Sequence, residues 1–166
     1  KKTDPLGFFA TKLYDGNGNV SQEIDPNGNV KLFEYDSLNR LKKKTLPDNL
    51  VQLVYDVRGN VSQIKNNQSQ LDFSYDVGGR LSSTQVQGLN AWSSLPNISI
   101  GYGYDFNNNR ALMTDPAGVT SYSYYQADRL ASLTNPRGET YGFGFDNANR
   151  ITSATRPGGS SAFAFD

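Results

Sequence analysis

The sequence has no cysteine and no histidine among its 166 residues. Disulfides, thiolate and imidazole nucleophile-base pairs and most transition-metal sites are therefore excluded. A Ser-Lys dyad or a carboxylate pair remains open, but an acidic residue that is repeated seven times along the chain is better explained by the fold. We expect no enzyme activity, no cofactor and no metal site.

The chain also has no excess of charge of one sign, because 16 basic residues balance 16 acidic ones. It lacks the long-range field that draws nucleic acid or an anionic membrane, so neither is expected as a partner. No apolar run approaches the roughly 18 residues of a membrane-spanning helix. The sequence opens in the middle of a repeat, without an initiator methionine or a signal peptide, and we interpret it as a segment of a longer chain.

An aromatic residue followed by aspartate recurs about every 20 residues, with one longer interval of 29 residues between Tyr75 and Tyr104. Such a period indicates one small supersecondary unit copied along the chain. Tyr124 falls in the same register, although Tyr125 replaces the aspartate. The pairs are Tyr14-Asp15, Tyr35-Asp36, Tyr55-Asp56, Tyr75-Asp76, Tyr104-Asp105, Phe145-Asp146 and Phe165-Asp166.

Each pair is followed by a short loop and then by a second, proline-containing turn. The loop is rich in Gly, Asn and Ser and leads to Asn or Arg with an apolar neighbour, the arginines being Arg40, Arg80, Arg110, Arg129 and Arg150. In this alignment the loop before Arg110 is one residue longer than the others. Proline fixes one turn dihedral, and Gly or Asn accepts a positive one. The turns are expected at 25–28, 46–49, 115–118, 135–138 and 156–159, with Asn66-Asn67-Gln68 in place of proline in one copy.

Between turn and anchor the side chains alternate, as in Phe33-Glu34-Tyr35 and Leu53-Val54-Tyr55. Alternation with a period of two is typical of a β-strand. The sequence therefore predicts an all-β chain of tandem hairpins of about 20 residues, forming one curved antiparallel sheet with an aromatic ladder on one face. A sheet this broad, with exposed edges, is expected to be part of a larger curved wall.

The order Tyr-Asp-x-x-Gly/Asn-Arg-Leu, a polar stretch, Pro-x-Gly and a further aromatic residue resembles the RHS or YD-repeat family. Residues 35–41 and 75–81 are the nearest matches to its motif. The resemblance implies hairpins that spiral into a hollow β-shell. In bacterial toxin complexes and polymorphic toxins such a shell encloses a C-terminal toxin domain of its own chain, and in animal teneurins a similar barrel serves cell adhesion. It implies a secreted or cell-surface location.

We divide the chain into an incomplete preceding repeat at 1–13 and a repeat array at 14–166, whose units begin near residues 14, 35, 55, 75, 104, 124, 145 and 165. The repeated residues are interpreted as structural anchors. The tyrosine packs on the next repeat, the aspartate accepts backbone amides, and the arginine pairs with an aspartate, as Arg40 would with Asp36 or Asp56. The expected partners are neighbouring repeats of the same parent chain and an enclosed C-terminal toxin or effector domain.

An insertion near 85–98 contains the one tryptophan of the chain. Leu89, Trp92 and Leu95 are spaced three apart, so a short helical turn ended by Pro96 could present them together. The loop could cover the sheet, or it could contact a partner. The alternative function is therefore a carbohydrate- or protein-binding adhesion module that uses these residues and exposed aromatics, or a fibre that self-associates through its sheet edges.

A calcium loop is considered at Asp15–Asn19, where oxygen side chains fall at the first, third and fifth positions of an EF-hand. Val20 and Pro26 occupy the positions that should hold Gly and Glu, so we expect no bound metal.

Overall fold

The computed structural model of the chain describes residues 2–3 and 9–164. Over these residues the regular secondary structure is almost all β-strand, joined by turns, and the 3-10 helices η1 (Asn90–Trp92) and η2 (Gln126–Asp128) are one turn each. The repeat unit expected to begin at Phe165-Asp166 lies outside the described residues. No helix in the described part of the chain is long and apolar enough to cross a membrane.

The strands follow one another at the predicted intervals, and strand order in the sheet follows the order of the chain from β1 to β16. The predicted tandem antiparallel hairpins are confirmed. The first nine strands are β1 (Lys2–Thr3), β2 (Phe9–Tyr14), β3 (Val20–Ile24), β4 (Val30–Tyr35), β5 (Leu41–Thr45), β6 (Leu50–Tyr55), β7 (Val61–Lys65), β8 (Ser69–Tyr75) and β9 (Leu81–Gly88). The others are β10 (Ile98–Tyr104), β11 (Arg110–Asp115), β12 (Gly118–Tyr124), β13 (Leu130–Thr134), β14 (Thr140–Phe145), β15 (Ile151–Arg156) and β16 (Gly159–Ala162).

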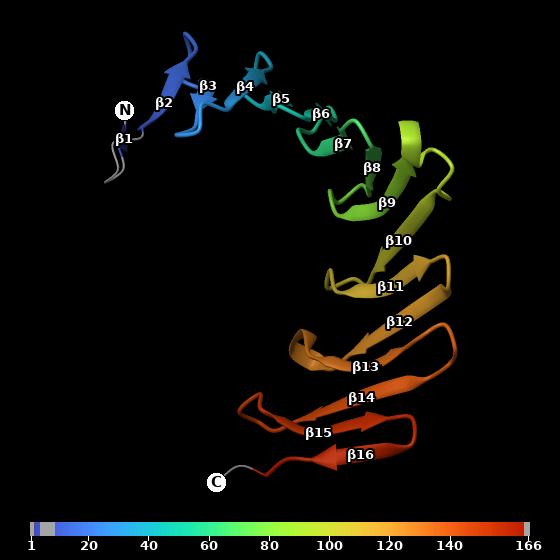
Figure 1. Cartoon of the computed structure of the whole chain (residues 1–166). Helices are drawn as coiled ribbons and strands as arrows, with labels where there is room; N and C mark the ends of the chain where they lie inside the picture. Colours follow the sequence, from blue (N-terminus) through green and yellow to red (C-terminus); the bar gives the residue numbers. More distant parts are fainter. Residues whose placement is uncertain (1, 4–8, 165–166) are drawn as a thin grey trace. The chain divides into compact units, whose positions relative to one another are not determined.

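The chain divides into two compact units, one of residues 1–73 with 85–97 and one of residues 74–84 with 98–166. In the first unit β2 to β8 pair in succession, and in the second β10 to β16 do the same. Figure 1 shows the successive hairpins of each unit side by side. Each hairpin can bury its side chains only against its neighbours, which is typical of repeat proteins.

The anchor aromatics lie at irregularities in the ladder. Tyr35 is opposite Leu41 and Phe33 is opposite Lys44, with a shift of register between Glu34 and Tyr35. A bulge of this kind re-aims a side chain and increases the local twist. The same shift directly precedes Tyr14, Tyr55, Tyr104, Tyr124 and Phe145.

The two faces of the strands differ in composition. Phe33 and Tyr35 are partly buried, whereas Leu32 and Glu34 are exposed, as the alternating pattern predicts. We call the side that carries Phe33, Tyr35 and their equivalents the aromatic face, and the other side the reverse face. In the second unit the reverse face is built largely from glycine and hydroxyl residues, among them Gly142 opposite Thr155 and Ser123 opposite Ser132.

No apolar side chain is buried among the described residues, and Thr120 is buried at 8% exposure. Valines and leucines such as Val54 and Leu112 remain about half exposed on the reverse face. A sheet one layer thick has no interior of its own. Its stability must come from contacts between hairpins, and apolar surface stays exposed on the sheet.

Candidate functional site

The loop that follows each anchor aromatic is a closed five-residue unit. In the loop Asp36–Arg40 the Asp36 amide donates to the Arg40 carbonyl at 2.9 Å, and the Asn39 amide donates to the Asp36 carbonyl at 3.0 Å. Asp36 Oδ1 also accepts from the Leu38 and Arg40 amides, both at 2.9 Å. The corresponding contact to the amide four residues on is made by Asp15, Asp56, Asp76, Asp105 and Asp146. The aspartate of the repeat therefore organises the loop.

The fourth residue of each loop has a left-handed backbone. Asn39 has a φ of 59°, and Gly18, Gly59 and Gly79 have φ values of 80° to 90°. Glycine and asparagine adopt this conformation at least cost, and a turn followed by such a residue is a standard hairpin connection. This requirement explains why Gly or Asn precedes the arginine of the motif.

The same bonds hold the aspartates in their charged form. The pKa of Asp36 is lowered from its ordinary value of 3.8, first by the Arg40 amide and then by the Arg40 guanidinium. In Asp15 and Asp56 the amide side chains of Asn19 and Asn60 lower the pKa most. These carboxylates are engaged by contacts within their own loop, which stabilise its closed conformation.

Arginine and tyrosine of neighbouring repeats are stacked. Arg40 donates from Nε and Nη2 to Asp36 Oδ2, both at 2.7 Å, and its guanidinium lies 4.3 Å from the ring centroid of Tyr55. The Tyr55 hydroxyl in turn donates to the Leu41 carbonyl at 2.9 Å. Tyr35, Tyr104 and Tyr124 donate in the same way to the carbonyls of Val20, Leu81 and Arg110. Each of these anchor tyrosines thus fastens its hairpin to the preceding one.

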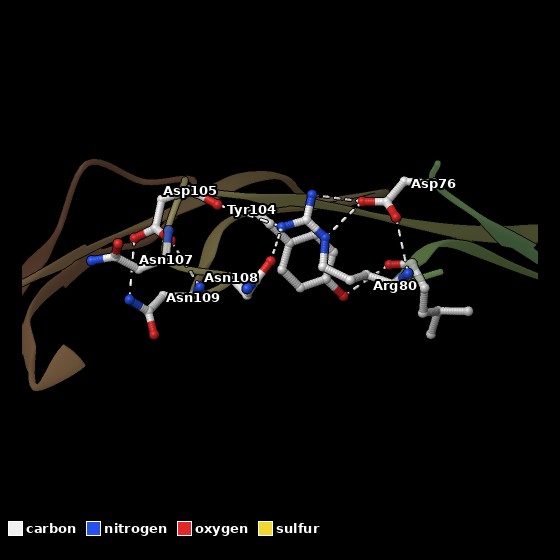
Figure 2. A network of polar contacts seen from close by, with 8 residues as sticks. Asp76, Arg80, Tyr104, Asp105, Asn107, Asn108 and Asn109 are labelled. Carbon is white, nitrogen blue, oxygen red and sulfur yellow. Dashed lines mark hydrogen bonds and ion pairs between the residues drawn. The ribbon is translucent and has the colours of Figure 1, made fainter. Parts of the chain in front are cut away.

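A second contact joins consecutive loops at one end of the strands. Figure 2 shows Arg80 between Asp76 of its own loop and Asn108 of the next, with the Tyr104 ring beside the guanidinium. Arg80 Nη1 donates to Asn108 Oδ1 at 2.7 Å. The last residue of one loop therefore bonds the left-handed residue of the next, and we call this series the loop ladder. Further rungs are Asn19 to Asn39, Asn109 to Asp128 and Arg129 to Asn149.

The structure corrects the alignment around Arg110. Asn109 donates from its amide to Asp105 Oδ1 at 2.8 Å and from its side chain to Asp105 Oδ2 at 3.2 Å, as the fifth residue of the other loops does. The loop has no extra residue, so the expected insertion before Arg110 was wrong. Arg110 occupies the next position, opposite Tyr104, which is apolar in the other repeats. Sequence reasoning missed this because it aligned arginine with arginine and did not count from Asp105.

Tyr125 stands where the repeat has aspartate, and Arg129 has lost its acidic partner as a result. Arg129 Nε is buried and has no hydrogen-bond partner among the described residues. Its guanidinium carbon lies 5.4 Å from the Phe145 ring centroid, and Nη1 still donates to Asn149 Oδ1 at 3.0 Å. Tyr125 and Phe145 meet edge to face, with centroids 6.3 Å apart. An aromatic contact has replaced the ion pair, and a buried donor remains unsatisfied.

In the first unit the inserted segment after β9 contacts the turn that lacks proline. The segment Leu89–Asn97 joins β9 to β10, and the Leu89 amide donates to the Gln68 carbonyl at 2.7 Å. Asn90 Nδ2 donates to the Asn67 carbonyl. The segment therefore binds the turn that lacks proline, at carbonyls of that turn. A pocket of about 260 Å³ lies there, lined by Leu50, Gln52, Lys65, Asn66, Asn67, Leu89 and Asn90.

The three apolar residues singled out in this segment differ in their surroundings. Leu89 precedes the 3-10 helix and lines the pocket, whereas Trp92 and Leu95 are about half exposed. The helix ends at Trp92, four residues before Pro96.

No group of three or more acidic residues that could hold a metal occurs in the described part of the chain. In the loop at Asp15, Oδ1 accepts from the Asn17 and Asn19 amides and Oδ2 accepts from the Asn19 side chain. The arrangement is that of a self-contained turn.

Comparison with protein families gives a match to the model described as RHS Repeat over residues 14–51 and 124–161. No curated protein sequence matches the chain.

Solved structures give a consistent fold. The chain superposes on a structure of the Photorhabdus luminescens Tc holotoxin pore with a TM-score of 0.74 and 16% identity, covering 90% of this chain and 9% of that one. A crystal structure of TcdB2-TccC3-TEV gives 0.74 and 17%, covering 89% and 9%. TcdB2-TccC3 without its hypervariable C-terminal region gives 0.74 and 17%, covering 90% and 9%. At these identities the likeness concerns the fold, and the chain spans only 9% of the length of these proteins.

Proposed function

Because this chain belongs to the RHS/YD-repeat family, we propose that it is a structural segment of the wall of an RHS-type shell that encloses a C-terminal toxin or effector domain. In this proposal residues 1–13 belong to a preceding repeat, residues 14–166 form the array, and the parent protein is secreted or exposed at the cell surface. The segment helps to enclose that domain and catalyses no reaction.

The observation that carries the proposal is that successive hairpins are linked by repeated contacts although the sheet has no buried apolar core. Anchor tyrosines and the loop ladder link hairpin to hairpin, as in Tyr55 to Leu41 and Arg80 to Asn108. At the same time no apolar side chain is buried in the described part of the chain. A sheet joined along its length but covered on neither face suits a wall that separates an interior from solvent.

The repeated polar residues support a role without catalysis. The carboxylates of Asp36 and Asp76 are held by loop amides and by the following arginines. An aspartate that makes the same contacts within its own loop in six copies of the repeat is used by the fold.

The experiment is limited proteolysis of the native protein that contains this segment, with intact-mass analysis before and after. The proposal predicts a parent chain several times longer than 166 residues and a C-terminal fragment that resists protease and stays non-covalently associated. A native protein no longer than this segment, or a C-terminal fragment degraded at the rate of the denatured protein, contradicts it.

A second candidate, a carbohydrate-binding adhesion module, is favoured by the pocket at the Leu89–Asn97 segment. Amide side chains are common partners of sugar hydroxyls, and Gln52, Asn66, Asn67 and Asn90 line this pocket. Trp92 of the same segment is 52% exposed. Glycan-array binding that is lost on Trp92→Ala supports this candidate, whereas absence of binding favours the wall.

A further inference from the structure

A shallow cleft of about 420 Å³ lies on the aromatic face of the second unit. It spans β9 to β12 and is lined by Leu81, Tyr102, Tyr104, Arg110 and Tyr124. A volume in this range is enough to hold a small organic group. The wall function gives this cleft no role.

Arg110 is the residue that sets this cleft apart from the rest of the array. It lies opposite Tyr104 on β11 and is exposed. The equivalent position in the other repeats holds an apolar residue, namely Val20, Leu41, Val61, Leu81, Leu130 or Ile151. One repeat has therefore placed a cation in the middle of an aromatic surface.

Arg110 is held in place without being neutralised. Its guanidinium carbon lies 4.6 Å from the ring centroid of Tyr122. The ion pairs found in the described residues join Arg40, Lys43, Arg80 and Arg150 to acidic residues, and Arg110 is not among them. Stacking on a ring orients the planar group without using its N–H donors, which stay available for a ligand.

The cleft offers two groups that can still donate, the Arg110 guanidinium and the Tyr102 hydroxyl. The hydroxyls of Tyr104 and Tyr124 already donate to the carbonyls of Leu81 and Arg110, at 2.9 and 3.0 Å. The Tyr102 hydroxyl makes no hydrogen bond within the described chain. A guanidinium and a phenol beside tyrosine rings match a ligand that carries a hydrogen-bond acceptor, negative charge and a flat apolar surface.

We propose that this cleft binds an aromatic carboxylate, with the carboxylate on Arg110 and the ring against Tyr102 and Tyr104. A carboxylate accepts two parallel N–H bonds from a guanidinium, which gives geometric selectivity as well as attraction. The same chemistry is offered by a small aromatic acid and by an aromatic-acidic pair in a polypeptide. The proposal does not depend on the wall function, since it concerns a single departure from the repeat.

The test is a titration of the 166-residue chain with benzoate, followed by the NMR signals of the tyrosine rings, with benzamide as the uncharged probe. Benzoate is expected to shift the ring signals of the cleft tyrosines and to bind at least ten-fold more tightly than benzamide. Arg110→Leu restores the residue type of the other repeats, so it should fold, and it should weaken benzoate binding at least ten-fold. Arg137→Leu, in an exposed turn of the same unit, is the matched control and should bind as the parent chain does.

A second titration uses the amidated dipeptide Phe-Asp to distinguish a polypeptide ligand from a small aromatic acid. Binding of both probes, each lost in Arg110→Leu, supports the site with a polypeptide as its occupant. Binding of benzoate alone, lost in Arg110→Leu, supports the site with a small aromatic acid. Binding of neither probe, equal binding of benzoate and benzamide, or binding unchanged in a folded Arg110→Leu chain overturns the proposal. Arg110→Lys gives a further check, because it keeps the charge but loses the planar fork and should bind at an intermediate level.

Discussion

The guanidinium of Arg80 lies 4.6 Å from the ring centroid of Tyr104, which belongs to the following hairpin. The same arginine is bound by Asp76 of its own loop and donates to Asn108 of the next. The Tyr104 hydroxyl donates a hydrogen bond to the Leu81 carbonyl. One arginine thus ties a loop, a ring and a neighbouring loop together, so the residues that define the repeat are those that join its copies.

The first prediction concerns the anchor hydroxyl. Tyr55→Phe removes the bond to the Leu41 carbonyl while keeping the ring under Arg40, and it should lower the free energy of unfolding by about 0.5–1.5 kcal/mol. Denaturant unfolding followed by circular dichroism measures this. Tyr141→Phe is the control, because the Tyr141 hydroxyl has no hydrogen bond within the described residues, and it should change stability little. Equal effects of the two substitutions would contradict the role assigned to the anchor.

The second prediction concerns the unsatisfied donor at Arg129. An acidic residue at position 125 would supply the acceptor that Arg129 Nε lacks, so Tyr125→Asp should be more stable than Tyr125→Ala by about 1–3 kcal/mol. Denaturant unfolding of the two variants measures the difference. Alanine is the reference, because both variants lose the edge contact to Phe145.

A double-mutant cycle provides the control for that prediction. In an Arg129→Leu background the advantage of Tyr125→Asp over Tyr125→Ala should shrink, since only the loop amides remain for the carboxylate to accept. An advantage of the same size in this background would mean that the introduced carboxylate acts only on the loop amides and would contradict the contact with Arg129.

The third prediction extends the loop ladder. Position 59 is glycine, with a φ of 90°, and a Cβ there would lie 3.6 Å from Arg40 Nη1. Gly59→Asn should add the acceptor that Asn108 supplies to Arg80, whereas Gly59→Ala has no acceptor and adopts the left-handed backbone at a greater cost. We expect the Asn variant to be the more stable by about 1 kcal/mol or more, measured by thermal and denaturant unfolding. If Asn and Ala are equally tolerated, the ladder contributes nothing at this position.

The fourth prediction concerns acid. The pKa values of Asp15, Asp36, Asp56, Asp76 and Asp146 are lowered in the folded chain by loop amides and by Asn or Arg partners. A carboxyl whose folded pKa is lowered contributes its full stability above the unfolded pKa, which is near 3.8, and loses it as pH falls from there through the folded pKa. The free energy of unfolding should therefore be flat above about pH 5 and decrease below about pH 4.

Asp36→Asn gives the matched test of the acid prediction. Asn135 shows that an asparagine can accept the two loop amides, from Arg137 and Glu139, so the loop should survive the substitution. The variant should be less stable than the parent near neutral pH and should lose less stability between about pH 4 and pH 2. An unchanged pH dependence would show that the Asp36 carboxylate does not contribute to the acid sensitivity.

Much of the fold could be predicted because it depends on local rules. The alternation of Phe33, Glu34 and Tyr35 indicated the strand and its two faces, and the prolines at 26, 116 and 136 marked the turns. The requirement for a positive φ accounts for Asn39 and Gly79 before their arginines. These features are set by single residues and their nearest neighbours, which a sequence shows directly.

The remainder depended on contacts between repeats. The place of Arg110 follows from bonds of Asn109 to Asp105, and residue type alone suggested the wrong register. The docking of Leu89 on Gln68 joins residues in two irregular segments, for which no periodicity gives a signal. The orphaned Nε of Arg129 could have been anticipated from Tyr125, because the repeat places an acid at that position.

The most direct measurement of the central claim is a cryo-EM map of the native protein that contains this chain. The account predicts that residues 9–164 form part of the wall of a closed, hollow enclosure, with separate density for a C-terminal domain inside it. A map in which these strands form an open module with both faces in solvent, and with no enclosed density, would contradict it.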